Sequence, residues 1–176
     1  MSFAVACVKR RDTEEWEECL KEGDKLRWYR QIKSELKRED YLSWDIPSQH
    51  RMLYARLRSG THWLRMESGR WRKEPEPERI CMACITGKVE SESHFLLDCY
   101  IYYGLRKSMF NTIKVKAGYD MELMDGNTDW QVDALLGHGL VDKEKRRIVG
   151  TAVSSFIAAA WRMRKRELKD SRQAQV

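Results

Sequence analysis

The stretch Cys81-Met-Ala-Cys84, followed by His94 and Cys99, decides how this chain folds. Nine residues separate Cys84 from His94, and four separate His94 from Cys99. Three thiolates and one imidazole form a complete tetrahedral ligand set for zinc. The Cys-x-x-Cys step lets both sulfurs reach one ion from a tight turn, and Gly87 lets the chain reverse between the two ligand pairs. These residues therefore predict one zinc ion per chain, held by Cys81, Cys84, His94 and Cys99.

A second interpretation of the same residues stays open, in which Cys81 and Cys84 are free thiols or a redox pair and His94 is an ordinary side chain. A redox Cys-x-x-Cys normally lies at a strand-to-helix junction of a βαβ unit, and no such pattern surrounds Cys81. Four protein ligands would leave no open coordination position, so we expect a structural rather than a catalytic metal. Another thiophilic metal would suit the same ligands.

Length and composition limit the class of protein. The chain has 176 residues, of which 42% are hydrophobic and 34% are charged, which suits one domain or two small ones with a modest core. No apolar run approaches the roughly 18–20 residues of a membrane span. The apolar start is short, and its charges follow it from Lys9 instead of preceding it as in a signal peptide. We expect an intracellular protein of the nucleus or cytoplasm, not secreted, with reduced cysteines.

The net charge of +6 is unevenly spread along the chain. Residues 50–73 carry seven basic side chains and one acidic, and residues 143–169 carry nine basic and two acidic. Between these blocks, residues 90–133 carry four basic and eight acidic side chains. Most cations of the first block are arginines, which suit bidentate phosphate contact better than lysines do. Charge runs also arise on ordinary solvated faces, and the basic end of the second block equally suits the C-terminus of a helix.

Apolar spacing predicts a mainly α fold, with helical segments flanking a small CCHC zinc knuckle and little or no β structure. A helix is expected over 12–40, capped by Asp12 and broken at Gly23-Asp24, and another after Ile46-Pro47. Met52, Leu53 and Leu57 are expected on one face of that second helix, which ends at Gly60, and Thr61 is expected to cap a short helix after it. Asp142 is expected to cap the last helix, whose apolar positions include Ile148, Ala152, Phe156, Ala159 and Met163. Ile113 to Val115 is the only β-like run.

Three regions follow from this pattern. A polar connector rich in proline and glutamate, residues 74–79, is the best boundary candidate. The regions are 1–73, helical with a basic Arg/Trp segment; 79–106, the zinc knuckle; and 107–176, a C-terminal helical region.

The segment Glu90-Ser-Glu-Ser-His94-Phe-Leu-Leu-Asp-Cys99, with Cys81-x-x-Cys84 before it, resembles the zinc-binding domain that follows the polymerase in reverse transcriptases of non-LTR retrotransposons. That family has Cys-x-x-Cys, a spacer, Glu-Ser-x-x-His and a closing Cys. The stretch Leu57-Arg-Ser-Gly-Thr61 is similar to an element upstream of its zinc site, and Tyr100 to Arg106 to the tail after it. The resemblance is specific over about 50–106, and it implies zinc ligation by the same four residues.

The family's domain belongs to a polyprotein that copies its RNA at a nicked genomic site, and its C-terminal part is thought to hold template RNA or target DNA. This chain has no Asp-Asp pair for two-metal polymerase catalysis, and no proline after residue 77 for the family's Pro-Asp nuclease signature. We therefore expect no catalytic residues, no enzyme activity and no small-molecule substrate. The chain looks like the detached C-terminal part of a longer replicating enzyme.

The first functional hypothesis is a zinc-stabilised module that binds single-stranded RNA or DNA. Cations contact phosphates, and flat aromatic rings stack on unpaired bases. Trp63 and Trp71 could equally be core residues, since a tryptophan is more often buried than displayed. The contact candidates are Arg56, Arg58, Arg65, Arg70, Arg72, Trp63 and Trp71.

The alternative hypothesis is a protein-interaction or scaffolding domain in which the metal is purely structural. The acidic middle, with its tyrosines and Trp130, would then dock a partner such as a polymerase domain. Pairing of the arginines with carboxylates of 90–133 would favour this alternative, and an open arginine face near the metal would favour nucleic acid.

Overall fold

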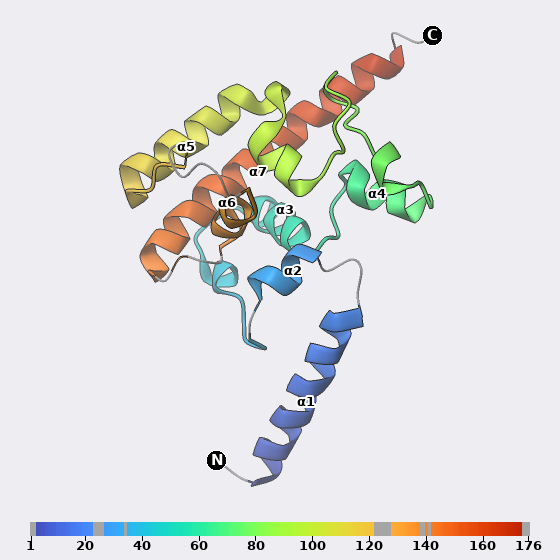
Figure 1. Cartoon of the computed structure of the whole chain (residues 1–176). Coiled ribbons are helices and arrows are strands. Elements are labelled where there is room, and N and C mark those ends of the chain that lie inside the picture. Colours follow the sequence, from blue (N-terminus) through green and yellow to red (C-terminus); the bar gives the residue numbers. More distant parts are fainter. Residues whose placement is uncertain are drawn as a thin grey trace.

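The computed structural model describes residues 3–22, 27–33, 35–121, 128–137, 140 and 142–173. Helices dominate these residues, which confirms the mainly α fold (Figure 1). No strand forms within the described ranges, where the β structure is a single isolated bridge between Ile80 and Val89. The α-helices are α1 (Phe3–Glu22), α2 (Arg27–Ile32), α3 (Ser48–Arg58), α4 (Arg65–Trp71), α5 (Tyr103–Ala117), α6 (Thr128–Leu135) and α7 (Lys143–Gln173). Shorter helical turns are η2 (Asp40–Ser43), η3 (Glu76–Glu78), η4 (His94–Asp98) and η5 (Tyr100–Tyr102).

The long helix α7 is the centre of the fold. It packs chiefly against α5 and α3, whereas α1 extends away from the other helices (Figure 1). Buried residues recur along it every three or four positions, at Val149, Val153, Ile157 and Ala160. The apolar face of α7 that the sequence predicts lies beside this buried face. Four of its five residues line a groove of about 740 Å³ between α5 and α7, namely Ile148, Ala152, Phe156 and Ala159.

Several sequence-based boundaries are confirmed. Oδ1 of Asp142 accepts hydrogen bonds from the backbone N–H groups of Glu144 and Lys145, at 2.8 and 3.1 Å, and so caps α7. Helix α3 begins directly after Pro47, and Gly60 follows its end with φ at +63°.

Other expectations are wrong. Helix α1 starts at Phe3, so Asp12 lies inside it and does not cap it. Residues 33 and 35–39 are not helical, and the run Ile113–Val115 lies within α5. Met52 is exposed, and Thr61 does not cap α4, whose N-cap position is Leu64. The expected break at Gly23-Asp24 lies outside the described residues.

No helix in the described ranges combines the length and the apolar character needed to cross a membrane.

Gly150 is the point at which η2 and its following turn pack against α7. A Cβ at this position would lie 1.9 Å from Cζ3 of the buried Trp44 ring. We expect Gly150→Ala to lower the free energy of unfolding by about 1–3 kcal/mol, because overpacking outweighs the better helix propensity of alanine. Urea unfolding monitored by circular dichroism measures this loss.

Gly104→Ala is the matched control, because a Cβ on this α5 residue would meet nothing within 4 Å. Its stability should stay unchanged or rise by up to about 1 kcal/mol. Equal shifts in the two variants would show that the Trp44 contact does not limit position 150.

Candidate metal centre

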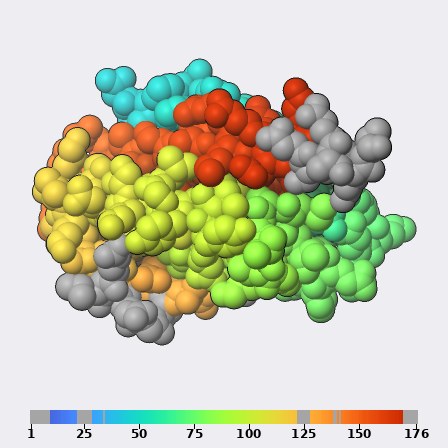
Figure 2. All heavy atoms as spheres, turned by 90° about the horizontal axis from the view of Figure 1, so that it is seen from above, coloured from blue at the N-terminus to red at the C-terminus, as the bar shows by residue number. Residues whose placement is uncertain are grey.

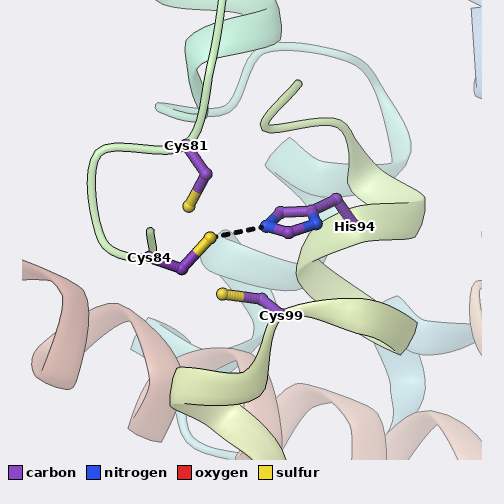
Figure 3. A group of neighbouring side chains, drawn as sticks. All are labelled: Cys81, Cys84, His94 and Cys99. Carbon is purple, nitrogen blue, oxygen red and sulfur yellow. Dashed lines mark hydrogen bonds between the residues drawn. The ribbon is translucent and has the colours of Figure 1, made fainter. Parts of the chain in front are cut away.

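Cys81, Cys84, His94 and Cys99 converge on one point in the structure (Figure 3). Their candidate ligand atoms all lie within 4.8 Å of one another. Four atoms bonded to one zinc ion at about 2.3 Å would lie roughly 3.8 Å apart, so the observed cluster is close to the required size. All four residues are buried, with Cys99 fully enclosed and Cys84 the most exposed at 9%. The structure therefore contains a buried Cys₃His group that could hold a metal ion.

A short loop presents Cys81 and Cys84. Backbone hydrogen bonds join Cys81 N to Lys88 O at 2.8 Å and Glu90 N to Arg79 O at 2.9 Å, and so close the base of the loop. Gly87 adopts a φ of +66°, which favours glycine and lets the chain turn back as expected. Both sulfurs consequently point to the same side of the loop (Figure 3).

A single π-helical turn, η4, presents His94 and Cys99. The Oγ of Ser91 accepts a hydrogen bond from His94 N at 3.1 Å, so that this serine caps the turn at its start. His94 O accepts a hydrogen bond from Cys99 N, five residues later, at 2.7 Å. One π turn therefore brings the imidazole and the thiol of a His-x₄-Cys spacing to the same point, and such turns are frequent at functional sites.

The thiols of the cluster shift each other's protonation. A hydrogen bond with Cys99, together with burial, raises the pKa of Cys81 to about 12. The same hydrogen bond lowers the pKa of Cys99. Nε2 of His94 lies 3.5 Å from Sγ of Cys84 and faces the cluster. A metal ion entering here would displace the thiol protons and bind thiolates, as zinc does at Cys₃His sites.

Glu90 connects the cluster to α7. Its carboxylate is 1% exposed, and Oε1 lies 3.9 Å from Sγ of Cys81. It forms a bidentate pair with Arg164 of α7, at 2.7 and 2.8 Å, and accepts a hydrogen bond from Arg65 N at 2.7 Å. Because Arg164 is itself only 5% exposed, this is a buried ion pair between the metal segment (residues 81–99) and the central helix.

Two further buried polar residues hold the metal segment. Nε2 of His62 donates to Oε1 of Glu92 at 2.9 Å, while its Nδ1 accepts a hydrogen bond from Leu64 N. The guanidinium of Arg106 donates to Leu96 O and Cys99 O at 2.8 and 2.7 Å. These bonds satisfy carbonyls at the end of η4, so Arg106 fixes the backbone that carries Cys99.

Sequence reasoning missed Arg164, although a signal was present. The basic end of the last helix was expected to be exposed, yet Arg164 lies four residues after Ala160 and seven after Ile157, on the buried face. His62, Glu90 and Arg106 lie within the stretches that carry the family resemblance, but their partners follow only from the three-dimensional contacts.

The seven nucleic-acid contact candidates differ in their exposure and in their partners. Arg58 is 5% exposed and pairs with Glu39 at 2.8 Å, so it does not lie on an open surface. Trp63 is half-buried against Trp161, with 4.0 Å between the ring centroids. Of the remaining five, Arg65 and Arg70 pair with Glu74 and Glu67. Arg72 is exposed and lies 3.8 Å from Glu74, and Arg56 and Trp71 are also exposed. The carboxylates that pair with Arg58, Arg65 and Arg70 all lie outside the acidic middle.

Comparison of the chain with protein-family models, with curated proteins and with solved structures finds no match.

Proposed function

We propose that this chain is a zinc-stabilised nucleic-acid-binding module that resembles the zinc-binding domain of non-LTR retrotransposon reverse transcriptases. The four ligands of the Cys₃His cluster would hold one zinc ion and leave no coordination position for water or substrate, so the metal supplies folding energy rather than catalysis. The contacts of Glu90 and Ser91 support the resemblance. In the Glu-Ser-x-x-His pattern, Glu90 pairs with Arg164 and Ser91 accepts a hydrogen bond from the backbone N–H of His94, so both residues stabilise the segment that carries the metal ligands.

The observation that carries the nucleic-acid role is the exposed cationic end of α7. Figure 2 shows this end of the helix, in red, beside the green surface of the metal segment. Between Trp161 and Lys169 there is one acidic residue, Glu167. Arg162, Lys165, Arg166 and Lys169 are exposed there. Cations spaced along two helical turns suit successive phosphates of a single strand, and the exposed ring of Trp71, on α4, is available for base stacking.

A salt titration tests this role. The logarithm of the association constant for a single-stranded RNA should fall linearly with the logarithm of salt concentration. We expect Arg162→Gln/Arg166→Gln to weaken binding and to reduce the magnitude of this slope by about 1.4, since each phosphate contact contributes about 0.7 on a single strand. Fluorescence anisotropy with a labelled oligonucleotide measures both effects.

The matched control is Lys143→Gln/Arg147→Gln, which removes two exposed cations from the opposite end of the same helix. Its slope should remain close to that of the unmodified protein. If both double variants lost the same affinity and the same slope, the effect would come from net charge alone and not from the C-terminal end of α7. Absent binding at low salt, or binding that ignores salt, would contradict the proposal and favour the protein-interaction alternative.

A further inference from the structure

Two buried cations share one carboxylate near the C-terminal end of α3. Lys33 Nζ lies 2.7 Å from Oε1 of Glu39, and Arg58 Nη2 lies 2.8 Å from Oε2 of the same residue. The side chains of Lys33 and Arg58 are each 6% exposed, and that of Glu39 is 17% exposed. The three charges therefore leave a net charge of +1 in a largely dehydrated place.

The surrounding described residues do not cancel this charge. The nearby Arg146 forms its own ion pair with Asp40 at 2.7 Å, which is neutral as a unit. The rings of Tyr41 and Tyr54 lie 5.3 and 5.7 Å from the Arg58 guanidinium, and their faces offset only part of a positive charge. An uncompensated buried charge is strongly unfavourable, so the cluster has the electrostatics of a site that lacks an anion.

A hollow of about 70 Å³ opens among these side chains. Nε of Arg58, which is buried, has no hydrogen-bond acceptor within the described part of the chain. A single water needs roughly 10–15 Å³ of such space, so the hollow has room for a group of about five heavy atoms. It is far below the roughly 300–1,000 Å³ of sites for larger organic ligands. The charged residues around it are five cations, among them Lys33, Arg58 and Arg146, and the three carboxylates of Glu35, Glu39 and Asp40, so positive charge is in excess.

Gly137 keeps this hollow accessible to the guanidinium. Its φ is +89°, and a Cβ there would lie 3.2 Å from Nη1 of Arg58 and 3.0 Å from the Tyr54 hydroxyl. A larger residue would thus press on the guanidinium of Arg58, which lines the hollow.

From this arrangement, we propose that the hollow binds a single phosphate group. A phosphate would supply the missing negative charge and accept N–H donors from Arg58 in the geometry that guanidinium groups favour, while Lys33 acts as a point charge beside it. The group is either inorganic phosphate or the terminal phosphate of an oligonucleotide, since both present the same oxygens. The proposal depends neither on the metal nor on the exposed cations at the C-terminal end of α7.

Thermal unfolding in sodium phosphate, with ionic strength held constant by sodium chloride, tests the proposal on the full chain. The Tm should rise by roughly 5–10 °C at a phosphate concentration a hundred times the dissociation constant. Lys33→Gln leaves Arg58 and Glu39 as a balanced pair, so its Tm without phosphate should equal or exceed that of the unmodified protein. The same variant should lose the response to phosphate.

Lys107→Gln, which removes an exposed lysine of α5, is the matched control and should keep the full response. The proposal would be overturned if phosphate left the Tm of the unmodified protein unchanged, or if it still raised the Tm of Lys33→Gln. A response to inorganic phosphate alone assigns free phosphate. Tighter binding of a 5′-phosphorylated than of a dephosphorylated oligonucleotide, lost in Lys33→Gln, assigns the terminal group. Failure of the oligonucleotide titration proposed above would leave the inorganic phosphate response intact.

Discussion

A Cys84→Ser variant is expected to lose its metal and the order of the metal segment together. Serine offers no thiolate, and a structural zinc ion contributes about 10–16 kcal/mol of binding free energy in small modules, which becomes folding free energy. The segment between Cys81 and Cys99 contains little regular secondary structure, with an isolated bridge at its base and one short helical turn. Elemental analysis should find one zinc per unmodified chain and none in the variant, and hydrogen exchange should accelerate across 81–99.

Cys19→Ser provides the matched control, since Cys19 is an exposed thiol of α1. This variant should keep one zinc per chain and unmodified exchange rates. A well-folded unmodified protein without any metal would contradict the proposed site, as would a Cys84→Ser variant that retains zinc at full occupancy.

The second large effect is expected from Arg164→Met, which breaks the buried pair with Glu90. Removal of one partner leaves an uncompensated carboxylate in a site that is 1% exposed. Such a loss costs about 3–5 kcal/mol, enough to remove much of the stability of an ordinary domain. Chemical unfolding of the zinc-loaded protein measures the change in the free energy of unfolding.

Glu90→Gln/Arg164→Met separates this pair from a simple packing effect. Glutamine removes the stranded charge and keeps an oxygen acceptor for Arg65 N, so the double variant should be more stable than Arg164→Met alone. Arg166→Met, at an exposed position of the same helix, should change stability by no more than about 0.5 kcal/mol. A cost below about 1 kcal/mol for Arg164→Met would show that the pair does not fasten α7 to the metal segment.

The local parts of this structure could be predicted from the sequence. The helix signals at Pro47, Gly60 and Asp142 depend on residues within one helical turn, and the ligand pattern depends on 19 consecutive residues. Both can therefore be recognised without knowledge of the tertiary structure. The signal at Asp12 failed because apolar residues before it extend the helix back to Phe3.

The long-range pairings could not be predicted. Glu90 and Arg164 are 74 residues apart, and their charges looked like solvated members of an acidic and a basic block. Arg58 belongs to the same arginine-rich run as Arg56, yet two residues along a helix correspond to a rotation of about 200°. Arg58 is therefore buried beside Glu39, whereas Arg56 is exposed. Charge counts along the chain therefore describe composition, and only packing decides which of these charges reach the solvent.

The π turn of η4 also determines how this chain tolerates changes in length. His94 and Cys99 lie side by side because five residues complete one turn of that geometry, and one residue more or fewer would rotate the second ligand away from the first. The loop around Gly87 is different, because open space surrounds it and a lengthened loop would extend into solvent. Insertions should therefore be accepted between the two ligand pairs and rejected within the second.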